Sequence, residues 1–499
     1  MGDATRTLDR SALTRSIPAG IAIGVVEVML AASIAGLLFS EVGGDALSRG
    51  VGFAALGAGV AMAVIGWRSG TTSVLGGLQA SIAAVVAGAV VAGVGEADPD
   101  SAVATAFVLV AISSLLVGVG LTVAGRFRLA QVIRFIPIPV VGGFLAGTGW
   151  LAAKGAVTVM VGLPGGWSEF LDLFGSDLAR LWIPGLVLGV AIAIARRRLS
   201  TFWAVPILLF AALGLFWFFT LALSSREAAE AGGWLLGPLA ETPRWIPLVP
   251  SDLADADWLA VVRQTGGIAT AILVALVGLL FNVSSLEIIN KVDLDANREF
   301  RSAGLSNLVA GVTGAPAGYQ HVTQSVMART AGGADRTMAL SAAAVCFAVA
   351  LAGGGLIELV PRFLLGGFLF AVGAGLLYEW LVAFRSRLPL IDYVLVVAIV
   401  GIVALVGFLP AVAFGVVAAA ALFAYSYSRA DAVRHRLTAA EHSSRVRRPP
   451  DHAAFLHDAG AQVFILELQG FVFFGSAHQV LQTVGTRLSD RDLPQARFV

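Results

Sequence analysis

The sequence predicts an all-α polytopic membrane protein with about fourteen transmembrane segments, arranged as an inverted repeat of seven plus seven. Three observations lead to this prediction. Apolar residues make up 58% of the 499 residues and charged residues only 13%, too few to cover a soluble protein. The loops between the apolar runs alternate in the sign of their charge. A glycine-rich pattern recurs at equivalent places in the two halves.

Apolar runs long enough to cross a bilayer recur from Ser16 to Ser428, after a polar N-terminal tail over 1–15. The first run is too long for a signal peptide, so we expect it to be retained as a span. The first repeat, 16–223, is expected to have segments at 16–40, 49–67, 80–94, 101–125, 137–162, 181–195 and 201–223. The second repeat, 258–428, is expected to have segments at 258–289, 302–313, 323–330, 337–359, 361–384, 390–408 and 411–428.

The third and tenth segments are expected to be half-helices, because glycines and polar residues interrupt the chain at their heads. The third follows the polar and glycine-containing stretch 70–79, and the tenth lies between breaks at 311–318 and at Gly332-Gly333. In transporters, half-helices point their N-terminal N–H groups into a polar cavity and hold anionic groups there. A re-entrant turn or a surface loop with ordinary glycine and proline punctuation is the alternative.

Loop charge fixes the expected orientation. Basic residues follow the even-numbered segments: Arg68; Arg126, Arg128 and Arg134; Arg196, Arg197 and Arg198; Arg385 and Arg387; and, after the last segment, Arg429, Arg434, Arg436, Arg445, Arg447 and Arg448. Acidic residues predominate in the odd-numbered loops, including the long loop 224–257. Basic loops stay cytoplasmic, so we expect both termini to be cytoplasmic and 224–257 to be external. A wrong segment count would scramble this alternation.

An internal repeat supports the division into halves. The pattern P-x4-GGFL-x3-G occurs at 137–149 and again at 361–373, with every fixed position matched. Each copy falls in the fifth segment of its set of seven. Because seven is odd, the two halves would lie in opposite orientations in the membrane, as in many secondary transporters. A chance match in a glycine- and leucine-rich sequence is the alternative.

Several functional classes are excluded by what the sequence lacks. The formal net charge of +1 gives no indication of nucleic-acid binding, and the single Cys346 excludes an internal disulfide framework. We find no H-E-x-x-H, P-loop, G-x-S-x-G or Cys/His cluster, so we expect no enzymatic activity, no metal and no cofactor. The basic stretch 429–460 is interpreted as a cytoplasmic linker.

Motifs along nearly the whole chain resemble the SulP family of anion transporters. They are the first span from Ala19-Gly20-Ile21, the half-helix head 76–79, the segment 297–307 (Asn-Arg-Glu through Gly-Leu-Ser-Asn) and the stretch 311–337. The stretch 462–485 resembles the opening strand and helix of the STAS domain that family members carry. The resemblance therefore implies an anion transporter followed by a partial α/β STAS domain over 461–499. We expect this incomplete domain to be loosely folded.

The chain departs from the family pattern at three places. Counted back from Thr337, Ser325 matches the family's serine, but Val326 stands where relatives often have arginine, and the nearest cation in sequence is Arg329. Leu78-Gln79 replace a common Gly-Pro pair, and Phe281-Asn282 stand where many relatives have a glutamate. These departures concern the expected substrate site more than the fold.

The candidate substrate-binding residues come from the two half-helix heads. They are Gly76, Gly77, Gln79, Thr323, Gln324 and Ser325, which would offer close backbone approach and neutral donors to an anion. Glu27, Lys154 and Asn282 are candidates for coupling, because polar groups within a membrane are costly and often functional. Their alternatives are a carboxylate paired in a helix interface, a lysine that reaches the interface, and an interhelical hydrogen bond.

The expected function is secondary active transport of a small inorganic or carboxylate anion, like sulfate or bicarbonate, by alternating access. A nucleobase or other uptake carrier with the same repeat, or a membrane sensor or scaffold signalling through its STAS-like tail, is the alternative. The expected partners are the anion, the lipid bilayer, a proton or sodium ion for coupling, and a second copy in a homodimer. We expect a multi-pass protein of the cell (inner) membrane.

Overall fold

The computed structural model describes residues 10–130, 137–162, 176–199, 203–235, 245–331, 335–352, 358–428, 433–442, 446–469, 474–490 and 493–497. Among the features used above, Arg134, Gly332-Gly333, Arg429 and Arg445 lie outside the described residues. The chain divides into two compact units, Met1–Gly415 and Val416–Val499, and the helix α18 crosses the boundary.

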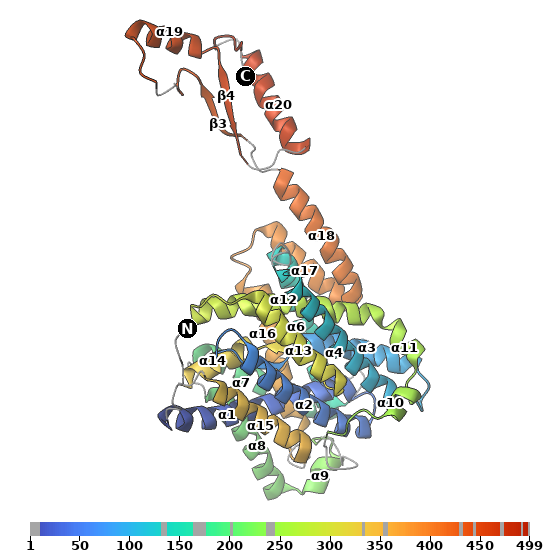
Figure 1. Ribbon diagram of the computed structural model, residues 1–499. Helices are drawn as coiled ribbons and strands as arrows, with labels where there is room; N and C mark the ends of the chain where they lie inside the picture. The colour runs from blue at the N-terminus through green and yellow to red at the C-terminus, as the bar shows by residue number, and fades with distance from the viewer. Residues whose placement is uncertain are drawn as a thin grey trace. The chain divides into compact units, whose positions relative to one another are not determined.

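The first repeat folds in the expected order (Figure 1). Its elements are α1 (Arg10–Phe39), α2 (Gly44–Arg68), β1 (Gly76–Leu78), α3 (Ala80–Glu96), α4 (Ala102–Arg126), α6 (Ile138–Val161), α7 (Ser176–Arg198) and α8 (Ala204–Leu223). The helix α1 begins at Arg10, inside the stretch that we expected to be a tail. The loop after α8 contains the short helices α9 (Arg226–Ala231), α10 (Pro250–Asp255) and α11 (Trp258–Arg263).

The second repeat follows the same order. Its elements are α12 (Thr265–Asn290), α13 (Ala296–Val312), β2 (Gly318–Gln320), α14 (Val322–Thr330), α15 (Arg336–Ala352), α16 (Arg362–Tyr378) with its π-helical end η2 (Glu379–Ala383), α17 (Leu390–Leu405) and α18 (Phe408–Ser428). The range 258–289 was expected to be one segment, but it is broken between α11 and α12 at Gln264. The helix α13 begins earlier than expected because the Asp295 carboxylate accepts a hydrogen bond from Asn297 N and caps it.

Length and hydropathy agree with a membrane protein. Within the described residues, eight helices are long and apolar enough to span a bilayer: those of α1, α2, α4, α6, α7, α8, α12 and α16. Four shorter apolar helices, α3, α15, α17 and α18, and the polar helices α13 and α14 complete the expected fourteen segments. In the most apolar stretch of α2, 83% of the residues are buried, against 28% in α8. The helix α2 is therefore central and α8 peripheral.

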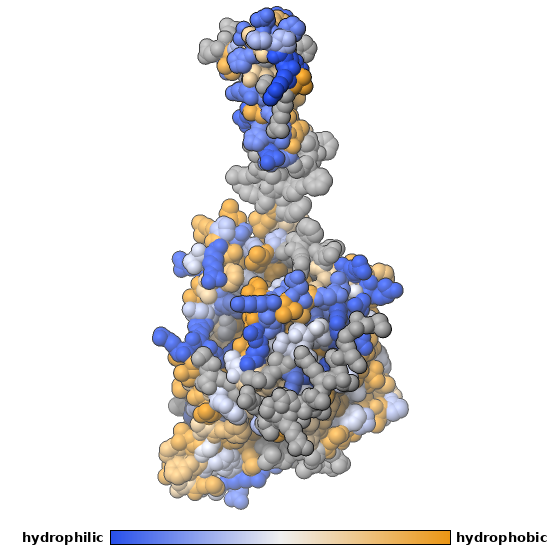
Figure 2. Space-filling view, turned by 60° about the vertical axis from the view of Figure 1, so that its left-hand side comes forward, coloured by the Kyte–Doolittle hydropathy of each residue, from blue (hydrophilic) through white to orange (hydrophobic). Residues whose placement is uncertain are grey.

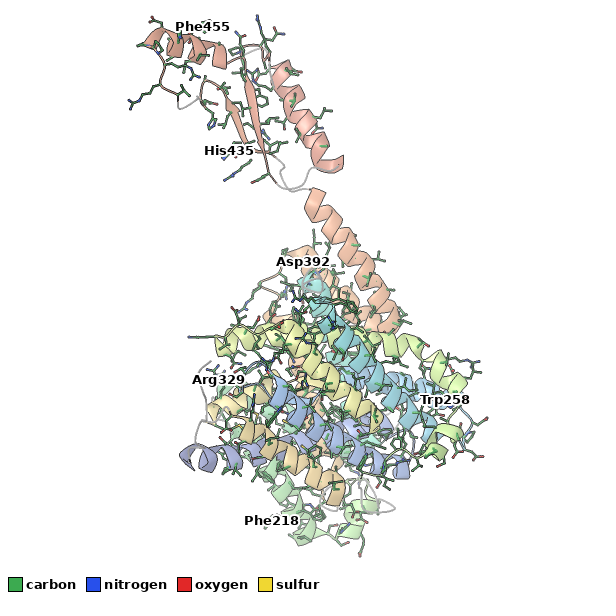
Figure 3. All side chains as sticks on the ribbon, in the orientation of Figure 1. Phe218, Trp258, Arg329, Asp392, His435 and Phe455 are labelled. Carbon is green, nitrogen blue, oxygen red and sulfur yellow. The ribbon has the colours of Figure 1, made fainter. Side chains whose placement is uncertain are left out.

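The peripheral helices present apolar side chains to the outside. Phe218 on α8 is 66% exposed, and its position is labelled in Figure 3. Hydrophobic side chains lie exposed over the face of the molecule shown in Figure 2. Such a surface is costly in water and is favourable against lipid tails.

Helix contacts show the equivalence of the two repeats. If the two halves are equivalent, each contact between one pair of segments must recur between the pair related to it. The contact of α4 with α13 recurs as α15 with α2, and that of α7 with α16 recurs as α17 with α6. The helices α6 and α16, which carry the two glycine-rich copies, contact each other. A Cβ on Gly149 would lie 2.8 Å from Gly373 O, and one on Gly373 would lie 2.6 Å from Gly149 O. The equivalent glycines therefore meet where the two helices cross.

The long loop after α8 is tied to the transmembrane helices. Arg49, near the start of α2, makes an ion pair with Asp252 of α10 at 2.7 Å, and its guanidinium lies over the ring of Phe107 at 4.8 Å. The hydrogen bond from Arg49 lowers the pKa of the Asp252 carboxyl, so this ion pair is kept at neutral pH and is lost only in acid.

The C-terminal unit is a small α/β unit. Its elements are β3 (Val433–Thr438), α19 (Pro450–Gly460), β4 (Phe464–Leu468) and α20 (Phe474–Ser489). The strands β3 and β4 pair antiparallel, with Leu437 opposite Ile465. Both β3 and α19 lie in 429–460, so the stretch expected to be a linker contributes a strand and a helix to this unit. The strand β4 and the helix α20 agree with the partial α/β domain that the sequence predicts.

Candidate functional site

The two half-helices begin directly after two short strands that pair with each other. The strand β1 runs antiparallel to β2, with Gly76 opposite Gln320, Gly77 opposite Tyr319 and Leu78 opposite Gly318. Two further backbone contacts extend the pairing, from His321 N to Leu75 O at 2.8 Å and from Gln79 N to Ala317 O at 3.5 Å. Equivalent strands of the two repeats therefore meet across the pseudo-two-fold axis, and this brings the N-termini of α3 and α14 together.

The backbone at these helix starts explains why their N–H groups are available. Gln79 and His321 precede α3 and α14 with extended backbone, and neither makes a side-chain capping hydrogen bond. The first N–H groups of any helix have no intrahelical acceptor and carry the positive end of the dipole. The pair of starts is thus a place where an anion can be held by backbone donors.

The two glycines of β1 have different surroundings. A Cβ on Gly77 would lie 2.9 Å from Glu27 Oε1 and 3.3 Å from Gln324 Nε2, so this position faces the polar groups of the site. A Cβ on Gly76 would lie 2.2 Å from Ala61 O of α2. Gly76 therefore permits close packing of the strand on α2, whereas Gly77 permits the close approach of Glu27 and Gln324.

Glu27 lies at the centre of this arrangement. Its side chain is fully buried. Its carboxylate accepts a hydrogen bond from Leu78 N at 2.7 Å and another from Gln324 Nε2. The carboxylate thus joins α1 to both half-helix heads. In the described part of the chain, no ion pair neutralises it.

The candidate donors of the half-helix heads make bonds within the protein. Ser325 Oγ donates to His321 O at 2.8 Å and accepts from Leu75 N at 3.0 Å. Gln79 Nε2 lies 3.4 Å from Tyr319 O. Gln324 donates to Glu27, whereas its Oε1 is buried and has no hydrogen-bond partner among the described residues. These side chains therefore connect strands and helices, and Gln324 also leaves one buried acceptor open.

A cation reaches this region from another helix. Arg196 Nη2, at the end of α7, donates to Thr323 Oγ1 at 2.8 Å, on the first turn of α14. The sequence pointed instead to Arg329 as the nearest cation. Arg329 is exposed and donates to Ile289 O and, at 3.0 Å, to Asn290 Oδ1, both at the end of α12 (Figure 3). Among the three arginines at the end of α7, nothing in the sequence distinguishes Arg196, because only the folded chain brings α7 close to α14.

The other two coupling candidates differ, since Asn282 contacts β2 whereas Lys154 does not. Asn282 Nδ2 donates to Gln320 O at 2.7 Å, so this side chain fixes the end of β2. Lys154 is exposed on α6. No described hydrogen bond links the Lys154 ammonium to the half-helix heads.

Two buried residues of α13, Asn307 and Glu299, bind β2, and they were not among the site residues predicted from the sequence. Asn307 donates to Gly318 O at 2.7 Å and accepts from Gly318 N at 2.8 Å. Gln320 Nε2 donates to the buried Glu299 at 2.6 Å, and Glu299 in turn accepts from Gly70 N at 2.7 Å. Glu299 and Asn307 belong to the 297–307 motif, which was the available signal. Among the described residues, no cluster of His, Cys, Asp or Glu could hold a metal ion.

Half-helices that meet at their N-termini inside an inverted repeat are typical of the substrate site in secondary transporter folds. The chain belongs to the sulfate permease family, whose model matches residues 13–399.

Two curated relatives of this chain are named as transporters of different substrates. The chain is 24% identical to the "Vacuolar basic amino acid transporter VSB1" of Saccharomyces cerevisiae over 80% of its own length and only 40% of the yeast protein. It is 22% identical to the "Bicarbonate transporter BicA" of Synechocystis over 79% of this chain and 68% of that protein. The chain thus spans less than half the length of the yeast relative.

The same fold is seen in a solved structure. The murine Solute Carrier 26 family member A9 anion transporter, in the inward-facing state, superposes with a TM-score of 0.71 at 16% identity, covering 97% of this chain and 80% of that one. At this identity the likeness concerns the fold.

Proposed function

We propose that the protein is a secondary active transporter of small oxyanions, of the sulfate or bicarbonate kind. The observation that carries the proposal is the meeting of the two half-helix N-termini, joined through β1 and β2, beside a guanidinium from α7. Backbone N–H groups, two helix dipoles and Arg196 all favour negative charge at one place. The names of the bicarbonate transporter and the anion transporter among the similar proteins agree with this chemistry.

Arg196 would supply the positive charge that Val326 does not. In the family pattern an arginine often stands at the position of Val326, on α14 itself. Here the guanidinium comes from α7 and reaches Thr323. An anion between the half-helices would then contact both α14 and α7, which belong to different groups of packed helices.

The site also contains acceptors, and these favour an anion that keeps a proton. Glu27 and Gln324 Oε1 are buried acceptors beside Gly77, and Gln324 Oε1 receives no hydrogen bond from the described residues. A buried acceptor without a donor is costly. Hydrogen carbonate carries both a negative oxygen and an O–H donor, so it would satisfy the donors and the acceptors together.

The arrangement of contacts supports alternating access. One group of elements is formed by α1, α2, α4, α13 and α15, which contact one another and carry the half-helix heads. The helices α6, α7, α16 and α17 form a second group. We propose that the first group moves against the second, so that the Arg196–Thr323 contact forms in one state and opens in the other.

Basic amino acids are a second candidate substrate class. The yeast relative is named as a basic amino acid transporter, and Glu27 is a buried carboxylate without a charged partner in the described part of the chain. An amino acid could place its carboxylate at the half-helix N-termini and its ammonium group against Glu27.

Uptake into proteoliposomes distinguishes these classes. Labelled sulfate, bicarbonate, dicarboxylates and arginine would be offered to vesicles with the full chain and to vesicles without protein, with and without a pH or sodium gradient. The proposal predicts protein-dependent uptake of bicarbonate or sulfate, with bicarbonate preferred, competed by other oxyanions. Uptake of arginine alone would support the second class, and uptake of none of them would remove the transport proposal.

The remaining assignments are also proposals. We propose that a proton or a sodium ion drives uptake, that the protein acts as a transporter without enzymatic activity, and that it forms a homodimer in the cell membrane. The basic loops favour cytoplasmic termini. We keep the division at 16–428 for the transporter, with 461–499 as a partial STAS domain.

A further inference from the structure

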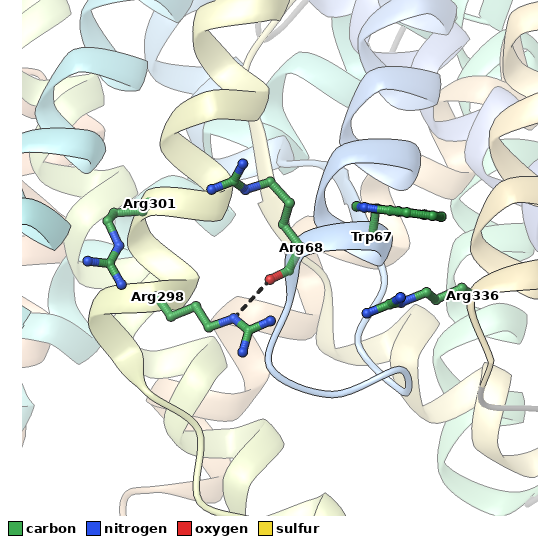
Figure 4. A pocket seen from close by; sticks show the side chains of 5 residues that line it. All are labelled: Trp67, Arg68, Arg298, Arg301 and Arg336. Carbon is green, nitrogen blue, oxygen red and sulfur yellow. Dashed lines mark hydrogen bonds between the residues drawn. The ribbon is translucent and has the colours of Figure 1, made fainter. Parts of the chain in front are cut away.

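A second basic site lies away from the half-helices, in a cavity of about 420 Å³. Its lining consists of one tryptophan and four arginines from three helices: Trp67, Arg68, Arg298, Arg301 and Arg336 (Figure 4). Trp67 and Arg68 end α2, Arg298 and Arg301 lie one turn apart near the start of α13, and Arg336 begins α15. The loop-charge pattern predicts that these helix ends are cytoplasmic.

Two of the guanidinium groups are held in place by neighbours. Arg298 donates from Nε to Arg68 O at 3.1 Å and from Nη2 to Ser69 O at 3.2 Å, at the carbonyl end of α2. Arg336 lies over the Trp67 ring, 5.0 Å from its centre. Both side chains are therefore ordered at the cavity and still have N–H groups free to bind a ligand.

The four positive charges have no neutralising carboxylate among the described residues. In the part of the chain that the structure describes, no ion pair includes any of these arginines. The nearby Glu299 is buried and accepts hydrogen bonds from Ser69, Gly70 and Gln320. Asp335 accepts from Ser16 Oγ and Met338 N. Like charges around one cavity repel each other, and a bound polyanion would relieve that repulsion.

We propose that this cavity binds a phosphate group carrying two negative charges. Guanidinium groups bind phosphate oxygens in pairs, and several forks around one cavity match a phosphomonoester or pyrophosphate better than a monovalent anion. The cavity lies at the ends of membrane-spanning helices and beside an interfacial tryptophan, so the phosphate can come from a lipid headgroup or from a free anion. Ser69 accepts a hydrogen bond from Arg298 and donates one to Glu299, and Glu299 accepts another from Gln320 of β2. An occupant of the cavity would therefore also stabilise this chain of contacts to the half-helix heads.

Binding to the purified full chain in detergent tests the proposal. Phosphatidic acid, with phosphatidylcholine as the neutral lipid, and pyrophosphate, with chloride as the monovalent anion, would be titrated while Tm is followed. We expect phosphatidic acid or pyrophosphate to raise Tm. The double variant Arg298→Gln/Arg301→Gln should weaken this response about tenfold or more in apparent Kd.

The matched control removes two arginines elsewhere on the predicted cytoplasmic side, Arg385→Gln/Arg387→Gln, and should keep the wild-type response. A response to the lipid alone assigns the site to a headgroup, and a response to pyrophosphate assigns it to a free anion. The proposal is wrong if neither ligand changes Tm. It is also wrong if the two double variants have the same apparent Kd for the ligand. If Arg298→Gln/Arg301→Gln fails to fold, the single variant Arg336→Gln, at an exposed position, provides the same test.

Discussion

Glu27 is the residue on which the proposed chemistry of the site depends most. It is buried, it accepts hydrogen bonds from both half-helix heads, and it has no charged partner in the described part of the chain. A carboxyl group in such surroundings can gain or lose a proton as the site fills and empties. This would link the protonation of the protein to the presence of the anion.

Replacing Glu27→Gln tests that link. Glutamine can still accept from Leu78 N through its amide oxygen, so the fold should be kept, but it cannot exchange a proton. We expect uptake in proteoliposomes to continue and to lose its dependence on an imposed pH gradient. Glu96→Gln, at the exposed end of α3, should keep the wild-type dependence. An unchanged pH dependence in Glu27→Gln would remove this residue from the mechanism.

Arg196 gives a second prediction for a single residue. If its guanidinium contributes charge to the anion site, Arg196→Gln should raise the half-saturation concentration of uptake about tenfold, the scale of a lost hydrogen bond to a charged group. Arg198→Gln removes the same charge two residues away on α7 and should change it less than about twofold. Equal effects of the two variants would mean that Arg196 acts only through the general charge of the loop.

The sequence identified most of the residues near the site but not what they bind. Gln324, Ser325, Gln79 and Gly77 all lie at the half-helix heads, as predicted from their positions after the breaks. Their hydrogen bonds to Glu27, Leu75 and Tyr319 join segments far apart in the chain. No local pattern contains that information. Arg196 was missed for the same reason, since only the packing of α7 near α14 shows its contact.

At the scale of elements, the paired strands β1 and β2 determine whether the site exists. Each has three residues, and each is buried throughout. The half-helices could be predicted from glycines, polar residues and segment length. The antiparallel register of Gly77 with Tyr319 could not, because it follows from the pseudo-symmetry of the two repeats.

Gly77→Ala tests whether transport needs the close approach of β1 to Glu27. The added Cβ would lie 2.9 Å from Glu27 Oε1 and would crowd Gln324. We expect transport to fall by at least about tenfold, as for an overpacked site. Gly88→Ala on the same half-helix is the control, because its Cβ would meet no atom within 4 Å. Wild-type transport by Gly77→Ala would show that the close approach of Glu27 and Gln324 to β1 is not needed for transport.

At the scale of the whole molecule, the inverted repeat was predictable and the C-terminal unit was less so. The glycine pattern at 137–149 and 361–373 identified the equivalent helices, and the contact of Gly149 with Gly373 confirms that they meet. In the C-terminal unit, β3 was not anticipated. Its sequence, Val-Arg-His-Arg-Leu-Thr, is basic and was interpreted as a linker, whereas its pairing with β4 makes it a strand.

The predicted orientation can be checked with cysteine labelling. Cys346 is buried, so a Cys346→Ser background allows single cysteines at Glu230, in the loop after α8, and at Glu441, after β3. We expect a membrane-impermeant thiol reagent added to intact cells to label position 230 and not position 441. Labelling of both positions, while a cytosolic marker stays unlabelled, would contradict the assignment of 224–257 to the outside and of the C-terminus to the cytoplasm.

The central claim is that an anion binds between the N-termini of α3 and α14, and transport kinetics of Gln79→Leu and Ser325→Leu test it most directly. Both substitutions replace polar groups at the half-helix heads with larger or apolar side chains. With correctly folded protein, verified by wild-type Tm and gel-filtration behaviour, we expect each variant to raise the half-saturation concentration for the transported anion about fivefold or more, corresponding to at least about 1 kcal/mol. Thr158→Leu, on the partly exposed side of α6, should leave it unchanged. Unchanged kinetics in both site variants would contradict the claim.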